Sequence, residues 1–329
     1  MTKKTISVVS PCYNEEDGIL ECYHAVQKIF AERLPNYNLE HIFCDNASTD
    51  RTVELLKQVA QNDKSVKIIV NSRNFGVLNN TYHGVLNATG DAVVLFMPVD
   101  LQDPPELIPD FVKHWEAGYE IVYGIRSRRE EVFFLAAARK VYYQLLSRIT
   151  YLDYPPNVGD FQLVDKCVLD AMKRIDDAQP FMRLMTFECG FRSIGVEYTW
   201  RARKHGFSRN TLARLFEQGL TGMISFSTAP IRLGLLAGGV IAAGSLLYAF
   251  LIFFLVLFGW TGAQSGIPTV IIALFFFAGV QLFFLGVIGE YVLAIFNQVR
   301  RKPLVIERER INFENDLTPA HSTDKQKAA

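Results

Sequence analysis

The sequence has no closely spaced cysteines. Its five cysteines form no C-x-x-C motif and are odd in number, and its six histidines are scattered. This pattern argues against a disulfide framework and against a structural zinc site. It is typical of a cytosolic domain whose thiols are reduced and mostly buried.

The chain also has no excess of charge of one sign and no apolar run at its start. Its 34 basic residues are balanced by 34 acidic residues, so no overall field favours nucleic acid as a partner. Lys3 and Lys4 are followed by a strand-like segment, residues 6–10, and not by the apolar core of a signal peptide. We therefore predict neither nucleic-acid binding nor secretion.

Hydrophobic residues make up half of the chain, and their excess lies in its last third. Residues 233–260 and 262–289 carry no charged side chain, and at about 1.5 Å per residue each run is long enough to cross a hydrocarbon core of about 30 Å. Basic residues flank the pair, at Arg232 and at 300–302, whereas the connector is uncharged. The positive-inside rule then predicts a multi-pass protein with both ends in the cytoplasm.

The first 123 residues alternate strand-like and helix-like patterns. The predicted segments are, in order, residues 6–10, 19–30, 40–44, 52–60, 66–70, 79–88, 92–97, 106–116 and 120–123. This β-α alternation predicts an α/β fold with a doubly wound, mostly parallel sheet.

Polar residues gather in the loops after the first four strands, at residues 11–16, 45–50, 71–76 and 98–106. The carboxyl ends of parallel strands meet at one edge, so these loops predict a ligand-binding crevice there. A carboxylate such as Asp45 is the usual partner of a ribose hydroxyl, and the guanidinium of Arg73 suits a phosphate. Asp100 and Gln102 offer the oxygen ligands that Mg²⁺ or Mn²⁺ prefers.

Each loop also has a plain structural interpretation. Ser48, Thr49 or Asp50 suits a helix N-cap, and residues 71–76 suit a turn. The acids of residues 100–103 could be solvated residues of an ordinary strand-to-helix loop. Capping and turns leave Asp45 and Arg73 unexplained, which favours the crevice.

Two basic amphipathic segments follow, at residues 131–150 and 211–230. Their pattern suits helices that lie in a membrane interface, although a helix packed on the sheet fits 131–150 equally well. The arginines near them suit phosphate or anionic headgroups.

Six motifs resemble, in order and spacing, those of the family 2 polyisoprenyl-phosphate glycosyltransferases. The likeness is greatest to bactoprenol-phosphate glucosyltransferases and smaller to dolichol-phosphate mannose synthases. The motifs are residues 7–16, 44–50, 72–76, 100–106, 159–165 and 286–291. They cover roughly residues 5 to 305.

The resemblance implies a GT-A fold and inverting transfer of a sugar from a nucleotide-sugar, with a UDP-sugar favoured, to polyprenyl (undecaprenyl) phosphate. It implies Mg²⁺ or Mn²⁺ as cofactor and the cytoplasmic face of the bacterial inner membrane as the place of reaction. The product would serve cell-envelope glycan or lipid modification. Two spans per chain also favour a homo-oligomer, with a tetramer as one candidate.

The resemblance also assigns residues by position. Asp160 would be the catalytic carboxylate, and Asp100 and Gln102 would hold the metal. The acceptor phosphate would meet Arg126, Arg128, Arg139 and Arg203. The nucleotide-sugar site would consist of Pro11, Tyr13, Asn14, Glu15, Asp45, Arg73, Asp91, Asp100 and Gln102.

The chain departs from the family pattern around the donor. Pro98 stands where the first carboxylate of a D-x-D motif is usual, so Asp100 would hold the metal with Gln102 and donor oxygens, or with help from Asp91 or Asp103. Asn46-Ala47 replaces the common Asp-Gly, and Val77 replaces a common lysine. We therefore expect weak metal affinity and a sugar other than glucose.

The predicted organisation is a catalytic domain, interface helices and a two-helix transmembrane hairpin. The catalytic domain is predicted at residues 1–210 and includes the interface helix at 131–150. A juxtamembrane amphipathic helix is predicted at 211–230, and the transmembrane hairpin at 231–299, with its spans at 233–258 and 268–296. The rest, residues 300–329, is a predicted cytoplasmic tail that is disordered at its end. Pro98 suggests a competing function, a catalytically weak or dead membrane protein that binds nucleotide-sugar or lipid phosphate. A processive polysaccharide synthase would have a Q-x-x-R-W motif and more transmembrane spans, and the sequence has neither. A transporter is a poor fit because the chain has only two predicted spans.

Overall fold

The computed structural model describes residues 3–128, 158–175, 177, 180–201, 229–258, 266–300 and 302–313. The chain divides into two units. The first contains residues 1–144, 152–209 and 301–329, and the second contains residues 145–151 and 210–300. The predicted interface helix at 131–150 lies outside the described residues, and so do residues 211–228 of the predicted juxtamembrane helix at 211–230.

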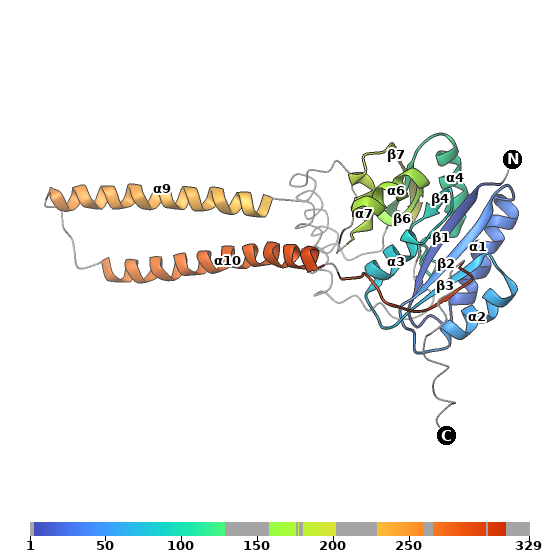
Figure 1. Ribbon diagram of the computed structural model, residues 1–329. Coiled ribbons are helices and arrows are strands. Elements are labelled where there is room, and N and C mark those ends of the chain that lie inside the picture. The colour runs from blue at the N-terminus through green and yellow to red at the C-terminus, as the bar shows by residue number, and fades with distance from the viewer. Residues whose placement is uncertain are drawn as a thin grey trace, which may run out of the picture. The chain divides into compact units, whose positions relative to one another are not determined.

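The first unit is built on a mixed sheet of eight strands in the order β7-β5-β6-β4-β1-β2-β3-β8 (Figure 1). The strands are β1 (Thr5–Cys12), β2 (Asn38–Asp45), β3 (Val66–Asn71), β4 (Ala92–Val94), β5 (Ile121–Arg128), β6 (Val158–Asp165), β7 (Ser193–Thr199) and β8 (Glu307–Ile311). β6 and β8 run antiparallel to their neighbours, and the other pairings in the sheet are parallel. The predicted α/β fold with a mostly parallel sheet is confirmed.

Helices cover both faces of this sheet (Figure 1). One face carries α1 (Ile19–Arg33), α2 (Thr52–Asn62), a 3₁₀ turn (Pro105–Leu107) and α4 (Ile108–Glu116). The other carries α3 (Val77–Leu86), α6 (Lys166–Ile175) and α7 (Met182–Glu188). The helices form because their apolar residues recur on one side, as in α1, which buries Cys22, Val26 and Ile29.

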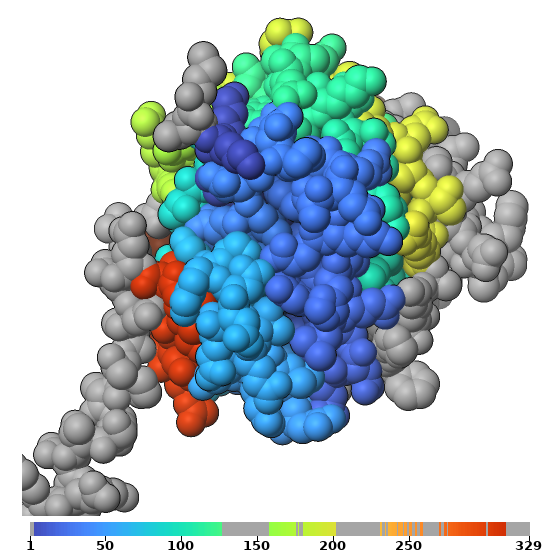
Figure 2. All heavy atoms as spheres, turned by 90° about the vertical axis from the view of Figure 1, so that its right-hand side faces the viewer, coloured from blue at the N-terminus to red at the C-terminus, as the bar shows by residue number. Residues whose placement is uncertain are grey.

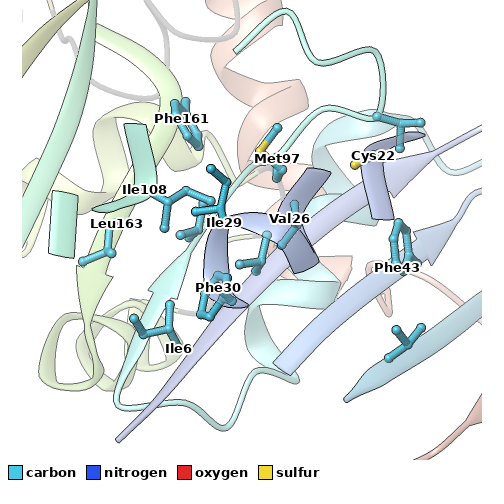
Figure 3. Close-up of a cluster of buried hydrophobic side chains, with 14 of the residues drawn as sticks. Ile6, Cys22, Val26, Ile29, Phe30, Phe43, Met97, Ile108, Phe161 and Leu163 are labelled. Atoms are coloured by element: carbon cyan, nitrogen blue, oxygen red, sulfur yellow. The ribbon is translucent and has the colours of Figure 1, made fainter. Parts of the chain in front are cut away.

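The core consists of two apolar clusters, one on each face of the sheet. Strand alternation divides β1 between them, because Ile6 and Val8 enter one cluster and Val9 enters the other. Figure 3 shows the first cluster, in which α1 side chains pack with Ile108 of α4. Two continuous cores fix the strands, and with them the loops at the strand ends.

β4 is shorter than the predicted strand 92–97, but its backbone continues toward the same edge. Leu95 N donates to Gln162 O of β6 (2.9 Å), and Met97 N donates to Val9 O of β1 (2.8 Å). The chain thus stays hydrogen-bonded between two neighbours until it turns at Pro98. This places the Asp100 loop directly beyond the carboxyl end of the sheet.

The tail predicted at residues 300–329 contains a strand, β8, that the sequence pattern did not predict. β8 pairs antiparallel with β3, and its Glu309 contacts Lys57 of α2 at 2.6 Å. Figure 2 shows this red segment beside the light-blue α2. Sequence periodicity misses β8 because four of its five residues are charged, as suits an edge strand.

The second unit contains two long helices, α9 (Ala229–Leu257) and α10 (Gly266–Arg300). They contact closely at Gly234, where a Cβ would lie 2.7 Å from the Phe284 ring. Of the described residues, the segment Phe276–Arg300 is long and apolar enough to cross a membrane, and Leu236–Ser245 is a shorter apolar stretch. The two predicted helices are therefore present, whereas a hairpin of two spans is not established.

Candidate active site

The loops after β1 and β2 interlock at the carboxyl edge of the sheet. Asn14 N donates to Ser48 Oγ (2.9 Å), and Thr49 N donates back to Asn14 Oδ1 (2.8 Å). Glu15 N donates to Thr52 Oγ1 at 2.9 Å. Ser48 and Thr49 thus tie one loop to the other instead of capping α2.

Asp45 is the last residue of β2, and it is fully buried. Its carboxylate accepts the Ser48 N–H at 2.9 Å and the Ser48 hydroxyl. Burial raises the pKa of Asp45, and the hydrogen bonds from Ser48 only partly oppose that effect. Asp45 is therefore a fixed hydrogen-bonding group at the end of a central strand, where the sequence predicts it.

Backbone strain is concentrated at this edge. In the described part of the chain four non-glycine residues have a positive φ: Asn14 (54°), Ala47 (63°), Leu101 (53°) and Asn312 (62°). The first three lie in the loops after β1, β2 and β4. Such conformations cost about 1–3 kcal/mol and cluster at functional sites, so they support a site here.

The loop after β3 presents Arg73. Its guanidinium lies 3.9 Å from the centre of the Phe75 ring, and Nη1 donates to Asn74 O (3.0 Å). Arg73 is exposed, so its charge is open to a ligand at the sheet edge.

The loop after β4 carries two carboxylates with different surroundings. Asp100 Oδ1 accepts the Gln102 N–H at 3.1 Å. Asp103 is buried, and its carboxylate accepts hydrogen bonds from Arg126 Nη2 at 3.0 Å and from the hydroxyl of Tyr198. Asp103 therefore fixes the loop, while Asp100 is partly exposed.

Arg126 is enclosed in this group. Burial acts to lower its pKa, but Asp103, Tyr198 and Asp160 together outweigh burial, so the pKa is raised. Its Nε donates to Tyr198 OH at 3.0 Å, and its guanidinium lies 5.5 Å from the centre of the Trp200 ring. Arg126 thus already supports the Asp103 loop, and its predicted contact with an acceptor phosphate stays a prediction.

Asp160 lies near the start of β6, which runs antiparallel and so begins at the carboxyl edge. It forms a two-point ion pair with Arg183 of α7, with Nη2–Oδ2 at 2.6 Å and Nε–Oδ1 at 3.1 Å. Each side chain is 22% exposed. The sequence signals for Arg183 are weak, because it lies outside every motif.

The structure brings most of the predicted residues to one edge of the sheet. Pro11 is the second-last residue of β1, just before Tyr13, and Arg128 is the last residue of β5. Asp91 is different, because it precedes β4 and accepts the Thr5 N–H (2.8 Å) at the amino end of β1. Asp91 therefore lies at the opposite edge, while Arg139 and Arg203 lie outside the described residues.

Two of the residues present, Asp100 and Gln102, have the type of oxygen ligand that a divalent cation prefers. Within the described ranges, no three His, Cys, Asp or Glu side chains are grouped as a metal cluster. Asp100 and Gln102 offer oxygen ligands, but Asp103 is occupied by Arg126 and Tyr198. Since Mg²⁺ commonly takes its other ligands from water and substrate phosphates, this small donor set is compatible with the ion.

Residues 7–172 match the sequence model of the family described as Glycosyl transferase family 2. The match includes the loops after β1, β2, β3 and β4 and the strand that carries Asp160. The chain belongs to glycosyltransferase family 2, and it is a glycosyltransferase with a GT-A-like mixed α/β sheet.

The relatives cover almost the whole chain. The chain is 36% identical to "Uncharacterized glycosyltransferase YkcC" of Bacillus subtilis, over 94% of this chain and 95% of that one. It is 33% identical to "Bactoprenol glucosyl transferase" of Shigella phage SfX, over 93% and 99%. Among solved structures it is similar to the mannosyltransferase PcManGT from Pyrobaculum calidifontis, with a TM-score of 0.43, 16% identity and coverage of 75% and 81%.

Proposed function

We propose that this glycosyltransferase transfers a sugar, with inversion, from a nucleotide-sugar to polyprenyl phosphate at the cytoplasmic face of a bacterial inner membrane. The observation that carries the proposal is one chain that combines a family 2 domain with two long apolar helices. A full-length relative named bactoprenol glucosyl transferase supports the same acceptor class. Two apolar helices per chain also favour a homo-oligomer.

On the donor side, we assign Asp45 to the ribose and Arg73 to the diphosphate, with Pro11, Tyr13, Asn14 and Glu15 around the nucleoside. Asp100 and Gln102 would hold a divalent cation. When bound, that ion offsets negative charge on the leaving diphosphate. A UDP-sugar is the donor that we favour.

On the acceptor side, the chemistry requires little proton transfer. A phosphate monoester has a second pKa of about 6, so it is largely deprotonated at neutral pH. Its oxygen attacks the anomeric carbon as the bond to the diphosphate breaks, and a nucleoside diphosphate leaves. Asp160, held by Arg183, then orients the acceptor or takes a residual proton, while Arg126 and Arg128 face the phosphate.

The test uses the full-length chain in membranes, a panel of nucleotide-sugars, and undecaprenyl phosphate or undecaprenol as acceptor. We expect one donor to give a lipid-linked sugar, read by mass, only with the phosphorylated acceptor and only with Mg²⁺ or Mn²⁺ present. Failure with every donor would overturn the proposal.

The variant Asp160→Asn tests the carboxylate in the same assay. We expect turnover to fall by about 10² or more, with nucleoside-diphosphate binding retained. Asp170→Asn is the matched control, because Asp170 is an exposed aspartate on α6, and it should keep full turnover. Near-normal turnover of Asp160→Asn would remove Asp160 from the mechanism.

A further inference from the structure

A chain of asparagine amides joins the loops after β2 and β3. Asn80 Nδ2 donates to Cys44 O, and Asn80 Oδ1 accepts from Asn71 Nδ2, both at 2.7 Å. Asn71 Nδ2 also donates to Asn46 Oδ1 at 3.3 Å. Asn46, Asn71 and Asn80 are all buried, so these amides depend on one another for partners.

Asn46 connects this chain of amides to the loop after β3, and both its Oδ1 and its Nδ2 form hydrogen bonds there. Its Oδ1 accepts the Phe75 N–H at 2.9 Å, and its Nδ2 donates to Asn74 Oδ1 at 3.0 Å. Asn74 Oδ1 also accepts the Gly76 N–H at 2.9 Å. The loop of residues 71–76 is thus attached to Asn46 at two successive residues.

An aspartate at position 46 could not make the same contacts. A carboxylate has no N–H for Asn74 Oδ1, and the Asn74 amide cannot turn without leaving the Gly76 N–H unpaired. The change would also place a second buried negative charge next to Asp45. The neutral amide is therefore specifically required by this arrangement.

Both contacts that position Arg73 go to residues that Asn46 holds. The Arg73 guanidinium stacks on the Phe75 ring and donates to Asn74 O. Arg73 is otherwise an exposed side chain on a loop. The location of its charge at the sheet edge thus depends on the link from Asn46.

We propose that Asn46 is a positioning residue for donor binding, which acts by holding Arg73 where the donor diphosphate lies. This proposal rests on the proposed function, because it assumes a nucleotide-sugar donor. Asn46 then affects the binding of the donor and not the binding of the acceptor.

The test compares the purified full-length wild type with Asn46→Asp and with the control Asn62→Asp. Asn62 lies exposed at the end of α2, so the control makes the same change in charge away from the site. UDP and GDP binding is measured by calorimetry, and the Michaelis constants for donor and acceptor are measured by transfer. We expect Asn46→Asp to weaken nucleoside-diphosphate binding and raise the donor KM by about tenfold or more, with the acceptor KM unchanged.

Two further variants keep the proposal falsifiable if Asn46→Asp folds poorly. Asn74→Ala removes the partner of Asn46 Nδ2 at an exposed position, and it should raise the donor KM alone. Adding Asn74→Ala to Arg73→Ala should have little further effect on the donor KM, because coupled residues are not additive. Additive losses would mean that Asn46 does not act through Arg73.

The outcomes separate this proposal from the one on which it rests. A wild type that binds neither UDP nor GDP overturns both. A wild type that binds, with a folded Asn46→Asp variant that binds equally well, overturns only the role of Asn46. Equal rises in donor and acceptor KM would also overturn it, because they indicate a general structural role.

Discussion

At the scale of single residues, the loops at the carboxyl edge combine strained backbone with buried charge. Ala47 and Leu101 have positive φ, and Asp103 is buried between Arg126 and Tyr198. Such features lower stability unless packing holds them, and here interlocked loops and two cores do so. Hydrogen bonds between the loops hold this edge without a ligand, as the proposed diphosphate site would require.

Ala47→Gly tests the backbone strain. Glycine has no penalty at positive φ but gains entropy in the unfolded chain, so we expect unfolding free energy to stay unchanged or to rise by up to about 1 kcal/mol. Ala60→Gly is the contrast, since Ala60 is buried in α2 and should lose about 1 kcal/mol or more. Urea denaturation of both variants measures the difference, and a clear loss for Ala47→Gly would contradict the strain.

Tyr198→Phe tests the buried group around Asp103. The variant removes a hydrogen bond to a charged carboxylate while Arg126 stays in place, so we expect a loss of about 1.5–3 kcal/mol of stability. Tyr119→Phe, at a half-buried tyrosine, should change stability by less than about 0.5 kcal/mol. Denaturant unfolding of the two variants provides the measurement, and equal losses would refute a special role for Tyr198.

At the scale of elements, β8 joins the segment that follows α10 to the sheet. Ser72 N donates to Ile306 O at 2.9 Å, so the residue before β8 contacts the Arg73 loop. Its Glu307 is nearly buried and contacts His83 Nε2 of α3 and Arg310 Nη2, each at 2.5 Å. Burial opposes ionisation of Glu307, but these two partners outweigh it and lower its pKa to about 2.

Glu307→Gln therefore has a predictable pH dependence. The pKa of Glu307 is lower in the folded state than its unfolded value of about 4.3, so its stabilising effect is complete above pH 5 and is lost as the pH falls toward 2. We expect wild type to melt at a higher temperature than Glu307→Gln at pH 7, and the gap to narrow between pH 5 and pH 2. The control is Glu309→Gln, because the ion pair of Glu309 with Lys57 is more exposed. Its melting temperature should differ less from that of wild type at pH 7.

At the scale of the whole molecule, the second unit exposes a long apolar surface. Large apolar side chains on α10 are more than half exposed, among them Leu282, Phe283 and Leu285. Apolar surface of this extent on paired long helices is unfavourable in water and is typical of contact with lipid or with a partner chain.

Leu285→Lys tests contact with lipid. Lysine at the centre of a membrane helix costs about 2.5–3.5 kcal/mol on insertion scales, and the cost falls near the helix end. We expect less Leu285→Lys protein in carbonate-washed membranes, whereas Val299→Lys, next to Arg300, should partition like wild type. Equal partitioning of both variants would mean that this part of α10 does not lie in the bilayer core.

Residue patterns alone predict the alternating α/β order, the two long apolar helices and the loops that carry Asp45, Arg73 and Asp100. These are local properties, since strand and helix periods and turn residues act over short stretches of chain. The side-chain partners are known only from the folded chain: Arg183 pairs with Asp160, 23 residues away, Tyr198 with Asp103, 95 residues away, and Glu307 with His83, 224 residues away. The fold also places Asp91 at the edge opposite the predicted site and adds β8 to the sheet. No local pattern encodes these features, because strand pairing and burial depend on which distant segments pack together.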